Sequence, residues 1–404
     1  MHSILLLSTL THIIYGSGIS QFGWQTSRLV QHLTNGDEQG QAMRFLSELC
    51  DDYGPRQTGS RNLEKAIDFV VRTLRNDGFD NVVTEEVKDL PYWIRGDDRV
   101  EMIEPRHHSL NILAVDGSPS GLVQAEAVVV SSYGQLTKMN YVGKIVVIAE
   151  PRASHVLADR GARAVLVNSA TPYSLYTPHT GNGARGSRIP SASITNEEAQ
   201  MLLRLYERKK RIVLRVDIRS REMPYKVTSR NIAFEIKGSK KPKEIVIISA
   251  HIDSTVRAVF FTAEEQGYLG AKAYQHAHAN DKIVFVAETD QGAFRPRLRN
   301  STFAFMSDTG KQYRLNQIAQ QLSNNGIPMT TDYSESQGDI YSIASTRDIP
   351  AVSFIPDKGG DNFYFRYHHS AADYVSVFEE GDLEYTAAVF ASLANVIANM
   401  DGWW

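Results

Sequence analysis

The sequence predicts an α/β protein: a three-layer α/β/α domain with a mostly parallel central sheet, interrupted by an inserted β-rich module. Helical and strand-like patterns alternate in the N-terminal and C-terminal parts, which is typical of α/β architectures. Nearly continuous apolar runs at Ile245–Ala250, Val256–Thr262 and Ile283–Ala287 indicate parallel strands that are covered on both faces. From about Leu110 to Ile218 the pattern changes to short strands separated by turns rich in glycine, serine and proline.

The individual elements follow from local periodicity and capping residues. A helix is predicted from near Ser60 to Gly78, because its apolar residues recur at helical spacing. A strand over Val82–Val87 follows it. Within the insert, Thr195–Glu198 has the pattern of a capping box that opens a helix, and Leu383–Ala398 is predicted to form a closing amphipathic helix. The strands expected in the insert are Ala125–Ser131, Lys144–Ala149, Ala164–Val167 and Ile212–Ile218.

The length of 404 residues is too great for one ordinary domain. We expect a discontinuous main domain over residues 19–109 and 219–404, with the insert at 110–218. A net charge of −3 gives no electrostatic reason to expect nucleic acid or an anionic membrane as partner. Cys50 is the single cysteine, so no disulfide can form within the chain, and a buried structural thiol is the expected role.

The first 18 residues have the features of a secretory signal peptide. The apolar run Ile4–Leu10 is short and is followed by small residues, which favours a cleaved signal over a membrane span of about 20 apolar residues. No later run is long enough to span a bilayer. A glycosylation sequon at Asn300 is compatible with secretion. The sequence therefore predicts a secreted protein.

Three predicted strands run into side chains that can bind metal. The first ends at His251 and Asp253, the second at Glu264–Glu265, and the third at Glu288 and Asp290, while a loop supplies His368–His369. In open parallel sheets, ligands bind beyond the carboxyl ends of the strands. We therefore expect these groups to converge on one edge of the sheet and to form a metal site.

Imidazole nitrogen and carboxylate oxygen are ligands of zinc, and two ions about 3.5–4 Å apart can clamp a tetrahedral intermediate. Of the Glu264–Glu265 pair, one carboxylate would bind metal and the other would act as general base toward water. Asp253 lies two residues after His251, so it is placed to accept the proton on the other ring nitrogen.

Several motifs together resemble the carboxypeptidase Q (plasma glutamate carboxypeptidase) family. The resemblance covers nearly the whole chain and is carried by more than one part of it. The motifs are Cys50–Arg56, Gly59–Glu64, Tyr92–Gly96, Ile248–Ser254, Phe261–Gly267, Glu288–Gly292 and Tyr367–Ser370.

The resemblance implies a dizinc exopeptidase with an inserted protease-associated domain, acting on small peptides with a free N-terminus through a metal-activated water. By motif, His251 and Asp290 would hold one zinc, Glu265 and His369 the other, and Glu264 would be the base. Similar proteins are homodimers that are secreted or found in lysosomes and the secretory pathway. Asp339 resembles a family position near the site, and His368, which stands beside the proposed ligand His369, would either pack there or contact the substrate.

One segment of the family pattern is absent. The family has a long stretch after the first metal motif, with an Asp-Asp-Gly run whose aspartate bridges both zincs, whereas here Ser254-Thr255 leads directly into the next strand at Val256. Parallel neighbours need a crossover of about a dozen residues or more. The two strands would then fuse, pair abnormally or have been joined by an omitted segment, and we favour a skipped exon or a faulty gene model as the explanation. With two protein ligands for each zinc, we expect weak metal binding and poor folding of the chain as written.

Two other functions remain open from the residues alone. The chain could be a catalytically inactive family member that binds peptides or partners through its inserted module. It could also be a cysteine hydrolase using Cys50, although no histidine or asparagine context supports that chemistry. Metal analysis separates the first alternative from the enzyme, and thiol alkylation tests the second.

Overall fold

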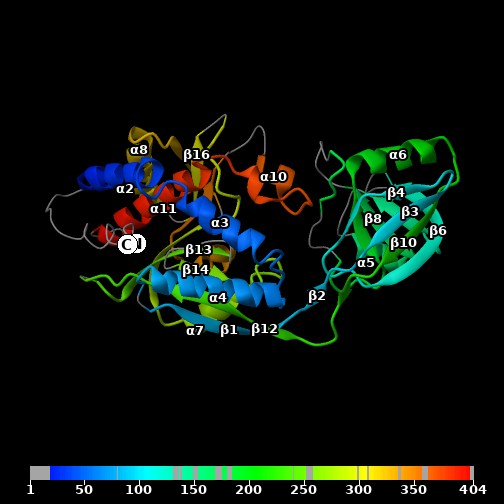
Figure 1. The fold of residues 1–404 in the computed structure, drawn as a ribbon, viewed down its shortest axis with the longest axis horizontal. Coiled ribbons are helices and arrows are strands. Elements are labelled where there is room, and N and C mark those ends of the chain that lie inside the picture. The colour runs from blue at the N-terminus through cyan, green and yellow to red at the C-terminus, as the bar shows by residue number, and fades with distance from the viewer. Residues whose placement is uncertain are drawn as a thin grey trace. The chain divides into compact units, whose positions relative to one another are not determined.

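The structure is a computed structural model in which the chain forms two compact units (Figure 1). The first unit comprises Met1–Leu90, Val227–Asn362 and Val375–Trp404, and the second Pro91–Lys226 and Phe363–Tyr374. The predicted insert, residues 110–218, lies within the second unit. The signal peptide predicted at residues 1–18 and Asp253 lie outside the described residues. Those described are 19–400 without 80, 131–135, 137–138, 149–152, 169–174, 180–183, 240, 252–257, 298–299, 307–308, 335–337 and 357–362.

The first unit is built from alternating helices and strands. The helices are η1 Ile19–Phe22, α2 Gly23–Asn35, α3 Gln41–Asp51, α4 Arg61–Asn76, α7 Leu269–Ala277, α8 Thr309–Asn324, α9 Asp339–Ala344, η3 Val375–Val377 and α11 Asp382–Asn399. The strands are β1 Val83–Leu90, β12 Val227–Phe234, β13 Glu244–His251, β14 Ala258–Phe261, β15 Lys282–Thr289, β16 Ser301–Met306, β17 Met329–Tyr333 and β18 Ala351–Ile355. All the helices and strands that the sequence predicts in this unit are present.

These strands form one eight-stranded sheet in the order β1-β12-β14-β13-β15-β18-β16-β17. The four central strands β14, β13, β15 and β18 run parallel to one another, whereas β1, β12 and β16 pair with antiparallel neighbours. The apolar runs that predicted buried parallel strands are therefore β13, β14 and β15, side by side in the middle of the sheet. The connection between β13 and β14 falls in residues 252–257, outside the described residues.

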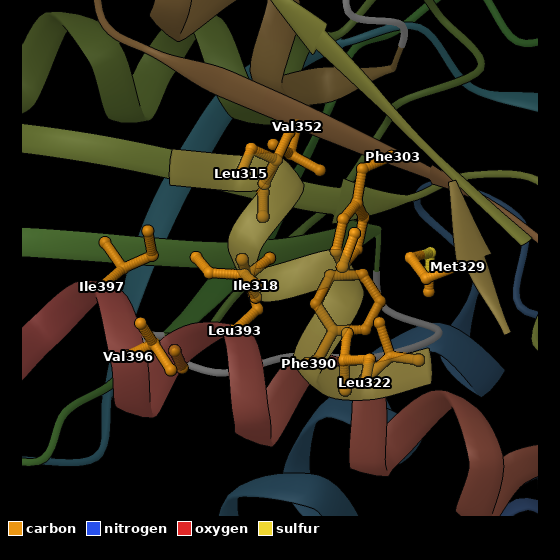
Figure 2. Packing of buried hydrophobic residues seen from close by; sticks show 14 of the residues in the cluster. Phe303, Leu315, Ile318, Leu322, Met329, Val352, Phe390, Leu393, Val396 and Ile397 are labelled. Atoms are coloured by element: carbon orange, nitrogen blue, oxygen red, sulfur yellow. The ribbon is translucent and has the colours of Figure 1, made fainter. Parts of the chain in front are cut away.

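Successive residues of a strand point to opposite faces of the sheet, so the apolar central strands present apolar side chains on both faces. Helices cover each of these faces. Ile248 belongs to a cluster with apolar residues of α8 and α11, while the adjacent Ile247 packs with residues of α7 and α9. Figure 2 shows the first cluster, in which Ile318 of α8 lies beside Leu393 of α11 and Leu315 of α8 lies beside Val352 of β18. Burying a side chain of this size stabilises the fold by about 1.5–3 kcal/mol. Because helices pack on both faces of the sheet, the predicted three-layer arrangement is confirmed.

Capping residues set the starts of the predicted helices. Ser60 accepts a hydrogen bond from the N–H of Leu63 at 3.1 Å, which opens α4 one residue after the position read from the sequence. In the second unit, Thr195 Oγ1 accepts from the N–H of Glu198 at 3.2 Å, and Thr195 Oγ1 lies 2.9 Å from a carboxylate oxygen of the same glutamate. An N-cap bond of this kind contributes about 0.5–2 kcal/mol. The predicted N-cap at Thr195 is confirmed, and the helix predicted from near Ser60 by its apolar spacing is present with a serine cap.

The second unit is rich in β-strands. Its elements are β2 Trp93–Ile94, β3 Arg99–Glu104, β4 His108–Leu110, β5 Ile112–Ala114, β6 Gly121–Val130, β7 Ile145–Ile148, α5 Ala153–Asp159, β8 Ala164–Asn168, β9 Ser191–Ile194, α6 Asn196–Glu207, β10 Val213–Ile218, β11 Arg221–Glu222 and α10 Phe363–Tyr367. Eight strands form one sheet in the order β4-β3-β10-β6-β7-β8-β9-β5, and β2 pairs with β11. Two apolar clusters lie in this unit, one of which includes residues of α6.

Among the described residues, no helix combines the length and the apolar character that a crossing of the bilayer would require.

Candidate metal centre

The carboxyl ends of three neighbouring strands bring His251 and Asp290 together. His251 is the last residue of β13 and pairs with Phe261 at the end of β14. On the other side, Ser249 of β13 lies opposite Glu288 of β15, so the two strands end level with each other. The result is a contact of 3.4 Å between His251 Nε2 and Asp290 Oδ1. Both side chains are partly exposed, at 28% and 26%, so a ligand can reach them.

Glu264 and Glu265 lie in a tight turn between β14 and α7. The carbonyl of Glu264 accepts hydrogen bonds from the N–H groups of Gly267 and Tyr268, at 2.8 and 2.7 Å. The turn closes where the N–H of Gly270 donates to the carbonyl of Thr262 at 3.0 Å. A Cβ at position 270 would lie 2.2 Å from that carbonyl oxygen, so only glycine permits this approach. The backbone thus fixes the glutamate pair immediately after its strand.

Asn231 of β12 ties this turn to the sheet. Its side-chain oxygen accepts from the N–H of Thr262 at 3.1 Å, and its amide donates to the carbonyl of Gly270 at 3.0 Å. At the tip of the turn, Thr58 donates to the side chain of Gln266 at 2.7 Å. Since Asn231 is buried, both ends of the turn are held by bonds that water does not compete for.

Two buried carboxylic acids, Glu288 and Asp339, lie behind the strand ends. Both are 0% exposed. Burial raises the pKa of Glu288 well above its usual range, and the neighbouring charges of Asp339 and Asp290 raise it further. Burial also raises the pKa of Asp339, and the charge of His251 acts in the opposite direction. Without a cation, this group of carboxylates is therefore electrostatically strained.

Tyr268 lies close to the same charges. Partial burial raises the pKa of its phenol, followed by the negative charges of Glu264 and Asp290. Its φ of 61° places it in the left-handed region, at the N-cap of α7. Tyr268 therefore stays protonated beside the acidic groups and keeps an O–H that can donate a hydrogen bond.

The predicted histidine pair belongs to the second unit. His368 and His369 follow α10, their rings stack with centroids 3.7 Å apart, and His369 has a φ of 55°. His179 of the same unit contacts the chain before and after the pair. Its Nε2 donates to the carbonyl of Arg366 at 2.7 Å, and its backbone forms a bridge with Ser370. Because a carbonyl only accepts, Nε2 of His179 carries the proton. The pairing of His369 with Glu265 in one metal site stays a prediction.

Two other predicted features are visible in the structure. Asn300 is exposed, whereas the next two residues of its sequon are buried in β16. Cys50 is half-buried, and its sulfur lies 4.0 Å from both terminal nitrogens of Arg56. A guanidinium at that position is a structural neighbour of the thiol and offers no general base for a cysteine nucleophile.

From the sequence, Glu288 is expected only as one of the groups that converge at the strand ends, and no role is predicted for Tyr268, Gly338 or His179. Glu288 stands two residues before Asp290, so strand alternation places both on one face, which was a usable signal. The contacts of Gly338 and His179 depend on residues far away in the chain, and no local pattern reveals them.

The donor set suits zinc. An imidazole and carboxylates are typical ligands of catalytic zinc, and both carboxylate oxygens of the buried Asp339 have no hydrogen-bond partner among the described residues. Buried unpaired carboxylates are costly unless a cation or a donor compensates them. A divalent ion held near His251 and Asp290 would supply that compensation.

Comparison with known proteins gives the family. The sequence is 32% identical over 429 positions to "Carboxypeptidase Q" of Mus musculus, covering 91% of this chain and 87% of that protein. The chain belongs to the carboxypeptidase Q family. The carboxypeptidase Q of Xenopus laevis is also 32% identical, over 95% of this chain and 91% of that protein. The model of "Peptidase family M28" matches residues 254–394. Membership of the carboxypeptidase Q family and the M28 match support the predicted class, a zinc metallo-exopeptidase.

Solved structures agree on the fold. A peptidase M28 precursor from Shewanella amazonensis superposes with a TM-score of 0.85 at 23% identity, over 95% of this chain and 98% of that chain. A zinc aminopeptidase from Bacillus subtilis gives a TM-score of 0.63 at 17% identity, over 87% of this chain and 93% of that chain. At these identities the likeness is one of fold.

The alignment to the mouse carboxypeptidase Q also bears on the missing segment. The alignment runs over 429 positions, which is more than the 404 residues of this chain, so the mouse protein has residues with no counterpart in this chain. These unmatched residues agree with a loss of internal sequence relative to the carboxypeptidase Q family, and their position after Ser254 stays a prediction.

Proposed function

We propose that this chain is a zinc-dependent exopeptidase that hydrolyses small peptides with a free N-terminus. One observation carries the proposal: His251 and Asp290 lie 3.4 Å apart at the ends of neighbouring parallel strands, beside the fixed Glu264–Glu265 turn, in a member of a peptidase family. Two curated relatives are named carboxypeptidase Q, which supports exopeptidase over endopeptidase activity.

The proposed roles follow the motifs. His251 and Asp290 would hold one zinc, and Glu265 with His369 the second. When bound, zinc polarises the scissile carbonyl and lowers the pKa of a water molecule. Glu264 would accept a proton from that water and pass it to the leaving amine. The fixed carbonyl of Glu264 limits the motion of its backbone, which favours a constant position of the carboxylate.

We further propose a secreted or lysosomal homodimer. The apolar N-terminal run and the exposed Asn300 support passage through the secretory pathway. The inserted unit would be a protease-associated domain, because it is a β-rich insertion in the main domain.

Dipeptide hydrolysis by the purified chain tests the proposal. The chain is stripped with a chelator, reloaded with zinc, and assayed by amine release from a dipeptide and from its N-acetylated form. We expect only the free dipeptide to be cleaved. Glu264→Gln should lower kcat by about 10²–10⁴-fold, the usual contribution of a general base, without changing zinc content.

The control variant is Glu207→Gln, which alters an exposed carboxylate at the end of α6 and should leave kcat unchanged. A zinc-loaded wild type that is no faster than Glu264→Gln would contradict the proposal and identify a non-catalytic member of the family.

A further inference from the structure

Asp339 is a buried carboxylate that the proposed mechanism does not use. It is 0% exposed, and neither of its carboxylate oxygens has a hydrogen-bond partner among the described residues. Leaving a buried acceptor unpaired costs about 1–3 kcal/mol, and more for a charged group. Such an orphaned side chain at the edge of a candidate metal centre calls for a ligand.

Glu288 fixes the backbone on both sides of Asp339. The N–H of Ile340 donates to Glu288 Oε2 at 3.0 Å, and a Cβ built on Gly338 would lie 2.6 Å from the same oxygen. That Cβ would also lie 3.2 Å from Asp290 Oδ2. Residues 338–340 therefore arch closely over Glu288 and Asp290, with Asp339 in the middle of the arch.

The same position brings Asp339 into the field of the other candidate ligands. After burial, the charge of His251 has the largest influence on the pKa of the Asp339 carboxyl, ahead of Glu264 and Asp290. Helix α9 packs against β13 and β15, the strands that end in His251 and Asp290. Geometry and electrostatics thus agree that Asp339 faces the strand ends.

A count of ligands shows what Asp339 could supply. Catalytic zinc usually has three protein ligands and one open position. The motifs give the first zinc only His251 and Asp290, because the family segment with the bridging aspartate is absent after Ser254. We propose that Asp339 is the third protein ligand of the zinc held by His251 and Asp290, and that Glu288 positions it by binding the backbone of Ile340.

This inference rests on the proposed function for the identity of the metal. The competing explanation is structural: Asp339 and Glu288 share a proton and hold α9 in place without any ion. The two explanations differ in what zinc does, because only a ligand changes the affinity and the spectrum of a bound metal.

Zinc binding by the full chain decides between them. Isothermal titration of the chelator-treated protein measures zinc affinity, and Co²⁺ substitution reports ligand number through its visible absorption. Asp339→Asn keeps the shape of the side chain. This variant should lower the affinity for the zinc held by His251 and Asp290 by at least about 100-fold, because the loss of a partner that only orients a ligand already lowers metal affinity by about 10- to 100-fold. Its Co²⁺ spectrum should change as well.

Asp348→Asn is the matched control, because Asp348 is an exposed aspartate close after α9 whose left-handed φ of 50° suits asparagine. It should bind zinc as the wild type does. Glu288→Gln retains an acceptor for the N–H of Ile340, so it should lose less affinity than Asp339→Asn. Thermal unfolding in chelator verifies that each variant folds.

The outcomes separate the two claims. If Asp339→Asn binds zinc as tightly as wild type while Asp290→Asn does not, Asp339 is no ligand. The proposed exopeptidase function would be unaffected by that result. If Asp339→Asn loses zinc but the loaded wild type cleaves no peptide, the ligand is confirmed and the proposed function fails. A wild type that takes up no zinc overturns both.

Discussion

Gly338→Ala is the sharpest perturbation of the arch over Glu288. Gly338 has φ 76° and ψ −158°, a region open essentially only to glycine, where another residue costs about 1–3 kcal/mol. The added methyl would also lie 2.6 Å from Glu288 Oε2, whereas ordinary contacts begin at 3.4 Å. Because the interior is close-packed, the arch or the buried carboxylate must shift by about 0.8 Å.

These two effects give the expected magnitude. Overpacking of a buried site costs typically about 1–3 kcal/mol, so together with the backbone penalty we expect the free energy of unfolding to fall by roughly 2–6 kcal/mol. A misplacement of about 1 Å at a catalytic or metal centre can cost about 100-fold. We therefore expect zinc affinity to fall by about that factor. Urea unfolding in chelator measures the first quantity and calorimetric titration the second.

Gly326→Ala provides the control. Gly326 also has a positive φ, 82°, but nothing lies within 4 Å of its built Cβ. It should cost only the left-handed backbone penalty of about 1–2 kcal/mol and leave zinc affinity unchanged. Equal destabilisation and equal zinc affinity in the two variants would refute the close packing of the arch on Glu288.

Three further predictions follow from other parts of the chain. His179→Ala removes the bond to the carbonyl of Arg366 and should lower zinc affinity by about tenfold or more, while His179→Gln, which keeps a donor, should lose less; unchanged affinity in the alanine variant would exclude a positioning role. Burial raises the pKa of Tyr385 to about 12. Its contribution to stability should therefore be complete below its unfolded pKa of about 10 and be lost as pH rises to about 12. Unfolding of Tyr385→Phe should show a weaker decline over that range, and an identical decline would contradict this assignment. Sequencing of transcripts across the codons of Ser254 and Thr255 should reveal, beside the present form, a form with an in-frame Asp-Asp-Gly segment, whose aspartate would take the place proposed here for Asp339 in the chain as written; a single transcript identical to the present sequence would exclude a gene-model error.

Much of the fold could be predicted from the sequence, because its signals are local. The apolar runs that became β13, β14 and β15 indicated buried parallel strands, and the structure places them side by side. Thr195 marked a helix start through capping chemistry that acts within three residues, and apolar residues at helical spacing marked the helix that begins after Ser60. The closing helix α11 is present as predicted, although its pattern indicated an amphipathic helix and the structure buries most of its residues.

The site was only partly predictable, for a physical reason. His251 and Asp290 could be placed together because parallel strands end at one edge. The arch of residues 338–340 over Glu288 could not be predicted. It depends on the hydrogen bond from the N–H of Ile340 to Glu288, about 50 positions away, and such a bond leaves no periodic pattern in the sequence. The same holds for His179, whose partner Arg366 lies 187 residues away. Contacts of this kind depend on tertiary packing.

Crystals of the full chain grown with zinc, with anomalous scattering recorded at the zinc edge, test the central claim most directly. We predict a peak about 2.0–2.2 Å from a ring nitrogen of His251 and from carboxylate oxygens of Asp290 and Asp339. Zinc located only elsewhere, or a map with no peak at the ends of β13 and β15, would contradict the account.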